Sequence, residues 1–506
     1  MAEFINKKRV MRNTILLYAR MGVMMLVSLY TSRVVLAALG VEDYGIYNVV
    51  GGIVTMFSML SMALGVAVRR FLNVEIAKDG GDQQWMLQSC VVAMFILAAI
   101  LLLLMETVGL WFLNNKLVIP EARLVAANVV FQVSIFTFIV RLLAIPFNSL
   151  IVAHERMGVY AYLGIVEVMA TLAIAFIIAN TSVDRLILYS VLLGGISLLI
   201  SLFYLIYCQT KILRLTSLKR FNKSQLKEIY GYSSWSLFGS VGAMLSSQGV
   251  NMVFNMFFGV AVNAAMGISN QVSNAFGNFV RNFQTAFDPQ LTKTYAADGL
   301  SEVTFEFACL ASRVSLILTA LLGYPLICNI SFVLNVWLTT VPDYTSVFCV
   351  VALVTMFIDG CAGALYILVY AKGDVRVYQL WLTTIQVVYF ALVYILCRMG
   401  FNPTVPILFN IVSYSFMFAA RLHILKDKMG FPVMRYLKAV VFPYFVPLMI
   451  LVVVFLITNI AFTINPIIRL LIHIVCVCLV LGFTYITNSE RKMLFALIKQ
   501  KLNRKE

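Results

Sequence analysis

The sequence predicts an all-α integral membrane protein with about fourteen transmembrane helices. Of the 506 residues, 62% are hydrophobic and only 12% are charged, and the mean hydropathy is +0.93. Long apolar stretches follow one another along the chain, and each reaches or exceeds the ~20 residues that cross a bilayer as a helix. These stretches form two sets of six separated by a basic segment, with a further pair at the end. We therefore expect two related six-helix bundles around a central cavity, plus an extra C-terminal helix pair.

Taken in order, the apolar stretches set the boundaries of the expected helices. The first six lie at 13–38, 44–68, 87–112, 123–150, 159–180 and 184–208. The next six lie at 229–257, 262–287, 304–328, 344–370, 378–398 and 404–424, and the final pair lies at 439–460 and 466–487. This division predicts three parts: an N-terminal six-helix lobe at 1–210, a C-terminal six-helix lobe at 211–430, and the additional helix pair with a basic cytoplasmic tail at 431–506.

The distribution of Lys and Arg predicts the orientation of the chain. Most of the 38 Lys and Arg residues fall in the two terminal segments and in alternate loops, whereas the loops between them hold few. Because positively charged loops stay in the cytoplasm, we expect both termini and the 209–228 loop on the cytoplasmic side of the membrane. In this setting the formal net charge of +16 reflects cytoplasmic loops next to anionic lipids, and we expect no nucleic-acid partner.

The sequence lacks the signatures of a catalytic or cofactor site. The nine cysteines are scattered through apolar stretches without a CxxC pair, and the three histidines do not cluster. GxxxxGK[ST], HExxH and GxSxG motifs are absent, and no stretch is long and polar enough to form a soluble catalytic domain. We therefore expect a protein that is not an enzyme, holds no metal or other cofactor, and draws on a proton or sodium gradient.

The helices expected at 229–257 and 262–287 are more polar than a membrane anchor needs to be. Polar side chains are costly against lipid, so a polar stripe along each helix predicts the wall of an aqueous cavity. The alternative is that Ser and Asn join neighbouring helices through hydrogen bonds. At helical spacing the stripes consist of Ser233, Ser240, Ser247, Asn251 and Asn255 in the first helix, and of Asn263, Asn270, Asn274 and Arg281 in the second.

Charged residues inside the expected helices predict that this cavity is cationic. Arginines exceed carboxylates there, so we expect an anionic substrate whose phosphate oxygens accept hydrogen bonds from guanidinium groups. Arg421 lies close enough to the cytoplasmic face to extend into water. Asp359 and Glu167 are the candidates for ion coupling, and the alternative is that each neutralises an arginine. The residues assigned to substrate binding are Arg20, Arg141, Arg281, Arg313, Asn251, Asn270 and Asn274.

Two helix hairpins share a similar turn sequence. Leu39-Gly40-Val41 joins the first two helices, and Phe258-Gly259-Val260 joins the seventh and eighth, 219 residues later. The first turn lies in the run TSRVVLAALGVEDYGIY at 31–47. This run resembles the first-hairpin signature of Wzx-type polysaccharide flippases, which export O-antigen and capsule and belong to the multidrug/oligosaccharidyl-lipid/polysaccharide (MOP) exporter superfamily.

The resemblance implies a specific function. It implies alternating access of a cationic cavity that moves undecaprenyl-pyrophosphate-linked oligosaccharide from the cytoplasmic to the periplasmic leaflet during lipopolysaccharide or capsule biosynthesis. The lipid tail would stay in the bilayer through a lateral gap between the first and eighth helices. The last helix pair would add either a lipid-facing groove or simply packing surface. The expected partners are this lipid-linked oligosaccharide, membrane lipids and other polysaccharide-assembly membrane proteins. The alternatives are a lipid II flippase, a multidrug or metabolite antiporter of the same superfamily, and, outside transport, a membrane polysaccharide polymerase.

Overall fold

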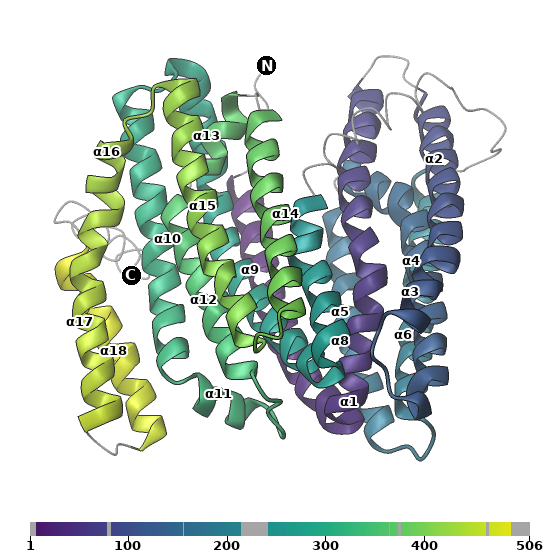
Figure 1. Cartoon of the computed structure of the whole chain (residues 1–506). Coiled ribbons are helices and arrows are strands. Elements are labelled where there is room, and N and C mark those ends of the chain that lie inside the picture. Colours follow the sequence, from purple (N-terminus) through teal and green to yellow (C-terminus); the bar gives the residue numbers. More distant parts are fainter. Residues whose placement is uncertain are drawn as a thin grey trace, which may run out of the picture. The chain divides into compact units, whose positions relative to one another are not determined.

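The described chain is built of helices. The computed structural model describes residues 7–77, 82–154, 156–213, 241–363, 365–372, 376–461 and 465–486, and no strand occurs among them (Figure 1). The predicted all-α fold is confirmed. The first part of the helix predicted at 229–257, most of the 209–228 loop and the basic tail lie outside the described residues.

The six helices predicted for the first half are all observed. Asp82 and Asp184 accept hydrogen bonds from backbone N–H groups of the following turn, which explains where two of these helices begin. The first two predicted helices are joined in α1 (Lys7–Ala77), and the third is α2 (Gln83–Leu104), continued by a π-helical turn (Met105–Gly109) and α3 (Leu110–Asn115). The others are α4 (Leu124–Ala153), α5 (Met157–Ala179) and α6 (Arg185–Lys211).

The second half follows the predicted order with more interruptions. A π-helical turn (Leu245–Gly249) precedes α8 (Val250–Phe258), and α9 (Val260–Asp298) follows after Gly259. Then come α10 (Glu302–Cys328), α11 (Ile330–Trp337), α12 (Thr345–Ala362), α13 (Leu365–Lys372), α14 (Arg376–Arg398) and α15 (Thr404–Met429). The extra helix pair consists of α16 (Val433–Tyr436), a π-helical turn (Leu437–Val441), α17 (Phe445–Leu456), a further π-helical turn (Ile457–Ala461) and α18 (Pro466–Thr484).

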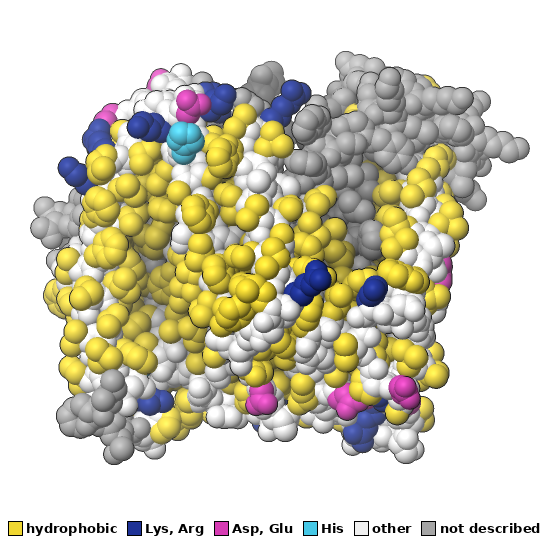
Figure 2. Space-filling view, viewed as in Figure 1, with side chains coloured by type: hydrophobic (Ala, Val, Ile, Leu, Met, Phe, Trp, Pro, Cys, Tyr) yellow, Lys and Arg dark blue, Asp and Glu magenta, His cyan; other side chains and the backbone are white. Residues whose placement is uncertain are grey.

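Eleven described segments are long and apolar enough to cross a membrane. They account for twelve predicted helices, because Met24–Met56 contains parts of the first two. The other two predicted helices contain α8, of which the described part is short, and α9, which carries a polar stripe. Large apolar side chains are exposed on the helices, for example Val125 at 74% and Phe483 at 76%, and Figure 2 shows this apolar surface in yellow. The chain is therefore a multi-pass membrane protein.

By compactness the chain divides into two units. Unit 1 comprises Met1–Ile268, Trp337–Thr345 and Gln386–Pro406, and unit 2 comprises Ser269–Val336, Ser346–Ile385 and Ile407–Glu506. Each unit has its own apolar core, which includes Leu87 and Phe131 in unit 1 and Leu316 and Tyr436 in unit 2. The lobes predicted at 1–210 and 211–430 are defined by the repeat of six helices, whereas these two units are defined by compactness. The boundaries of the lobes therefore stay a prediction.

The two hairpin turns have nearly the same backbone conformation, which supports the repeat. Gly40 has φ 78° and ψ 172°, and Gly259 has φ 78° and ψ −171°. This region of backbone space is open almost only to glycine. The hairpins also touch inside unit 1, because a Cβ atom on Gly267 would lie 2.6 Å from the Asn48 amide. Asn48 and Gly267 are themselves 219 residues apart, so the repeat brings equivalent positions into contact.

Candidate functional site

An ion pair lies halfway along the helices of unit 1. Arg141 of α4 lies 2.5 Å from the carboxylate of Glu167 in α5, and it also donates to the Ser197 hydroxyl of α6 at 2.9 Å. The side chains of Arg141 and Glu167 are 56% and 32% exposed. Exposed charges at this depth are costly against lipid, so this surface of α4 and α5 is one that water reaches.

A second ion pair lies in unit 2. Arg421 of α15 donates to the Asp359 carboxylate of α12 at 2.6 Å, and its side chain is only 12% exposed. The expectation that Arg421 extends into water is therefore wrong, because a carboxylate on the neighbouring helix holds it inside the unit. The Asp359 side chain is 47% exposed and marks another surface that water reaches. Both ion-coupling candidates, Asp359 and Glu167, thus neutralise an arginine in this structure, and their part in coupling stays a prediction.

The polar stripe of α9 continues into unit 2 and is exposed there. Arg281 and Asn274 are exposed, and Asn270 is half-buried. Arg281 donates to the Asn278 side chain at 3.0 Å and lies over Gly277, where a Cβ atom would come within 3.1 Å of the guanidinium. Among the described residues, no carboxylate lies within ion-pair distance of Arg281. The arrangement leaves its guanidinium able to bind an anion.

Two assigned arginines cannot be placed in this group. The side chain of Arg20 lies outside the described residues, although its backbone belongs to α1. Arg313 of α10 is buried and donates to the backbone oxygens of Ala439, at 3.0 Å, and Tyr485. Its guanidinium also lies 4.6 Å from the centre of the Tyr485 ring. In this structure Arg313 therefore links α10 to the C-terminal helix pair through hydrogen bonds.

Three asparagines of the predicted stripes join helices and do not line water. Asn251, Asn255 and Asn263 are all at most 2% exposed. Asn263 donates to the backbone and side-chain oxygens of Asn251 at 2.7 and 2.8 Å, and Asn255 donates to Asn263 at 2.7 Å. Because every amide here finds a partner inside the protein, the alternative reading of the stripe, helix–helix hydrogen bonding, describes these positions.

The same asparagines help to close one end of unit 1. The Asn255 amide pairs with both backbone groups of Val118, accepting from N–H at 2.8 Å and donating to the carbonyl at 3.3 Å. The indole of Trp337 donates to the Leu29 carbonyl of α1 at 2.7 Å. Val118 and Trp337 are again 219 residues apart, so each repeat sends its third loop onto the first helix of the other. We call these two contacts the hairpin latch. Sequence reasoning missed Val118 and Trp337. The repeat offset relates the two positions to each other, but it does not give the helix that each contacts.

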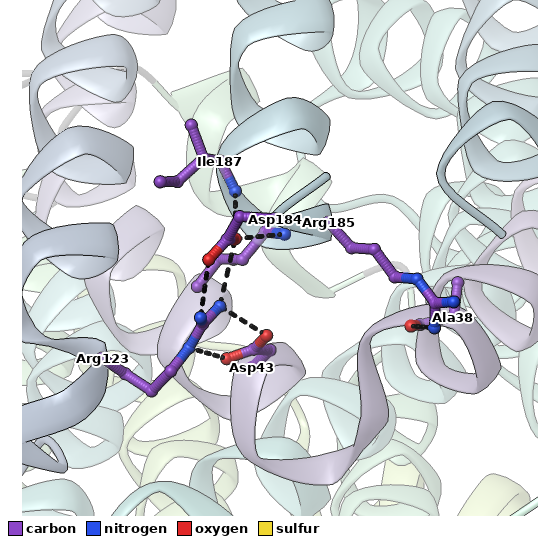
Figure 3. Close-up of polar contacts among 7 residues, drawn as sticks. Ala38, Asp43, Arg123, Asp184, Arg185 and Ile187 are labelled. Carbon is purple, nitrogen blue, oxygen red and sulfur yellow. Dashed lines mark hydrogen bonds and ion pairs between the residues drawn. The ribbon is translucent and has the colours of Figure 1, made fainter. Parts of the chain in front are cut away.

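Arg123 joins three helix ends of unit 1 next to the first hairpin turn. It donates to the Asp43 carboxylate at 2.7 Å and to that of Asp184 at 2.6 Å (Figure 3). Asp184 also caps α6 through the backbone N–H groups of Leu186 and Ile187. The hydrogen bond from Arg123 is the main cause that holds the pKa of Asp184 below its ordinary value. Asp43 of the motif-like run at 31–47 thus fixes the turn to the ends of α4 and α6.

Unit 2 contains an apolar groove with a volume of about 410 Å³. Its walls come from α10, α12 and the segment that leads into and forms α17, and no charged residue lines it. The polar group of Tyr324 is turned away, because its hydroxyl donates to the Leu451 carbonyl at 2.8 Å. Lining residues include Tyr324, Phe357, Cys361, Leu451, Val452 and Phe455. A groove of this composition suits a hydrocarbon chain and not a soluble ion.

Comparison with known proteins identifies the fold. No protein-family model and no curated protein matches the chain. Among solved structures, the lipid II flippase MurJ in an inward closed conformation superposes with a TM-score of 0.69 at 14% identity, over 93% of this chain and 99% of that one. An inward-facing multidrug resistance MATE family transporter of the MOP superfamily gives 0.62 at 13% identity, over 82% of this chain and 96% of that one. The MATE multidrug transporter DinF-BH gives 0.56 at 16% identity, over 85% and 97%. The chain therefore has the fold of the flippases and transporters of the MOP superfamily.

Proposed function

We propose that the protein moves undecaprenyl-pyrophosphate-linked oligosaccharide from the cytoplasmic to the periplasmic leaflet of a bacterial inner membrane, for O-antigen or capsule assembly. Both termini would face the cytoplasm. The apolar groove of unit 2 carries this proposal, because its uncharged hydrocarbon lining suits part of an isoprenoid chain.

The exposed residues of α9 fit the other end of such a substrate. Arg281 offers a planar, permanently charged guanidinium for a pyrophosphate, and Asn270 and Asn274 offer amide groups for sugar hydroxyls. Arg141 lines a surface that water reaches in unit 1, and we keep Arg20 in the proposed set on its sequence position. Asn251 and Arg313 are left out, because their polar groups are already engaged by neighbouring helices.

The hairpin latch supports a transport cycle by alternating access. In the proposed orientation it lies on the periplasmic side, so the observed contacts between Asn255 and Val118 and between Trp337 and Leu29 close that side. Opening toward the periplasm requires these contacts to break while the substrate headgroup crosses. Few hydrogen bonds are involved, and an opening of this size is accessible at ordinary temperature.

Lipid II is the second candidate substrate, and one observation favours it. The match to the lipid II flippase MurJ extends over 93% of this chain, whereas the two MATE transporters compared with it cover 82% and 85%. Lipid II shares the undecaprenyl pyrophosphate portion, so the groove and Arg281 suit both compounds equally.

The test is a flipping assay on the full-length protein in proteoliposomes. Fluorescent undecaprenyl-pyrophosphate oligosaccharide, fluorescent lipid II and a soluble cationic dye are each offered, and transfer is followed by a membrane-impermeant quencher or by dye uptake. We expect transfer of the oligosaccharide and loss of that transfer in Val452→Arg, which places a charge in the groove. Leu479→Arg, on the exposed face of α18, is the matched control. Transfer of lipid II alone supports the second candidate, and uptake of the dye alone defeats both.

A further inference from the structure

A completely buried histidine joins three elements of unit 2. His473 of α18 is 0% exposed. Its Nδ1 atom lies 2.8 Å from the side-chain nitrogen of Asn329, directly after α10, and its Nε2 atom lies 2.8 Å from the hydroxyl of Thr458, in the π-helical turn after α17. Arg469, one turn earlier on α18, donates to the Asn329 side-chain oxygen at 3.0 Å. We call Asn329, Thr458, Arg469 and His473 the His473 clasp.

The hydrogen bonds of the clasp fix where the imidazole proton lies. Asn329 must point its oxygen at Arg469, which can only donate, and its nitrogen also meets the Pro325 carbonyl at 2.9 Å, which can only accept. The Asn329 amide therefore donates to Nδ1 of His473, and the imidazole proton is on Nε2. That proton is accepted by Thr458, whose own hydroxyl donates to the Val454 carbonyl at 2.8 Å. Every donor meets one acceptor, and the imidazole is neutral.

A second proton on His473 has no acceptor in this arrangement. It would set an N–H group against the amide nitrogen of Asn329, next to the positive charge of Arg469. The other titratable groups near the ring are Tyr324 and Cys328 of α10 and Cys476 of α18, and the π-helical turn after α17 contributes Thr458 and Asn459, which do not titrate. No carboxylate contacts the clasp among the described residues. Protonation therefore breaks the bond between Asn329 and His473.

The clasp is connected to the apolar groove through one side chain. Tyr324 lines the groove, donates to the Leu451 carbonyl of α17, and meets the His473 ring edge to face at 5.4 Å. Loss of the clasp therefore loosens the wall formed by α17 against the wall formed by α10, which the hydrogen bond from Tyr324 to Leu451 still joins. His473 lies seven residues after Pro466, about 10 Å from the N-terminal end of α18.

We propose that the His473 clasp is a proton-sensitive fastener of the groove, closed when His473 is neutral and released when it is protonated. The assignment of the groove to an isoprenoid chain rests on the proposed function, but the response of the clasp to acid does not. Asp359 and Glu167 are each held by an arginine, whereas His473 is a buried group whose protonation changes the packing of whole helices.

The experiment is hydrogen–deuterium exchange of the full-length protein in lipid nanodiscs at about pH 7.5 and about pH 5, on either side of the ~6.5 of free imidazole. Variants are compared with wild type at the same pH, so the intrinsic effect of pH on exchange cancels. We expect wild-type protection of residues 457–461 and 466–480 to fall roughly tenfold in acid, which corresponds to ~1.4 kcal/mol. His473→Gln keeps a donor and an acceptor without titrating, and its protection should not change with pH.

Asn329→Asp provides the complementary test. A carboxylate at position 329 accepts from protonated His473 and from Arg469, so the clasp should stay closed in acid. Equal protection of the wild type at both pH values, or an equal acid loss in wild type, His473→Gln and Asn329→Asp, overturns the proposal. A negative flipping assay with acid-sensitive protection would instead reject the proposed function and leave the clasp standing.

Discussion

The arginines of this protein differ in the groups that surround the guanidinium. These groups show which arginines can bind a ligand and which hold helices together. Arg313 and Arg421 are buried against backbone oxygens or a carboxylate, whereas Arg281 is exposed beside Asn278 and Gly277. Sequence position alone put Arg281 and Arg313 in the same class, because periodicity gives the face of a helix but not the neighbour that the face meets. Of these three arginines, Arg281 is the one that presents its guanidinium at the surface of its unit.

Arg281 should be essential for transfer of the proposed lipid-linked substrate. We expect Arg281→Ala to lose about tenfold or more in initial flipping rate, because a charge-assisted hydrogen bond contributes ~1.5–3 kcal/mol. Arg281→Lys should keep part of the rate, since it keeps the charge but not the planar fork. Arg398→Ala, at the exposed end of α14, serves as the matched control. Equal rates in Arg281→Ala and Arg398→Ala would remove Arg281 from the site.

Asp184 should make the stability of unit 1 depend on acid. Arg123 lowers the pKa of this carboxyl in the folded protein, so the unfolded chain takes up the proton at higher pH than the folded one. The stabilisation is therefore complete above ~4, the ordinary pKa of Asp, and is lost as the pH falls through the lower folded value. At neutral pH we expect the melting temperature of Asp184→Asn to lie below that of the wild type. Below about pH 4 the difference between the two melting temperatures should become smaller. Melting curves in detergent at several pH values measure this, and a gap that is constant across the series contradicts it.

The turns at Gly40 and Gly259 each join two helices into a hairpin. Hydropathy predicted the helices on both sides of each turn, and the shared Leu/Phe-Gly-Val sequence predicted that the turns correspond. The asparagine stripe was harder to read from sequence. Its period is equally compatible with lining a cavity and with joining helices, and only packing shows that Asn251, Asn255 and Asn263 join helices while Asn274 is exposed.

Replacing the turn glycines should be costly for conformational reasons alone. No atom lies within 4 Å of a Cβ on Gly40, but its positive φ strains any other residue by ~1–3 kcal/mol. We expect Gly40→Ala and Gly259→Ala each to lower the melting temperature. Gly51→Ala is the control, since Gly51 is helical and has equally open space around it. It should be neutral or should stabilise by up to ~1 kcal/mol. If Gly51→Ala lowered the melting temperature as much as Gly40→Ala, the positive φ of Gly40 would not be the cause of the loss.

At the scale of the whole molecule, the repeat governs how one end of unit 1 is closed. Val118 and Trp337 occupy equivalent places in the two repeats and each binds the first helix of the other repeat. The fold class, the order of the helices and the hairpin repeat were all predictable from sequence, because hydropathy and turn glycines act locally. The latch was not, since it depends on contacts between residues more than one hundred positions apart, such as Val118 and Asn255.

Weakening the latch should shift the protein toward an open periplasmic side. Asn255→Ala leaves both backbone groups of Val118 without a side-chain partner, and we expect a cysteine at position 48 to react roughly three- to tenfold faster with a periplasmic reagent, the equivalent of ~0.7–1.4 kcal/mol. Asn128→Ala removes a comparable asparagine from an exposed pair with Asn114 in unit 1 and should leave the rate unchanged. If both variants react at the wild-type rate, the contacts at Val118 do not hold that side closed.

The close contact of Gly45 with the backbone of Val260 can be used to trap a second state. A Cβ atom on Gly45 would lie 2.0 Å from the backbone oxygen of Val260, a distance that no side-chain movement can relieve. A single methyl group at position 45 therefore acts as a wedge that only separation of the hairpins accommodates. Gly45→Ala is thus the variant to prepare for capturing the protein with this end apart, and nanobodies raised against it would select for a conformation in which the hairpins are separated.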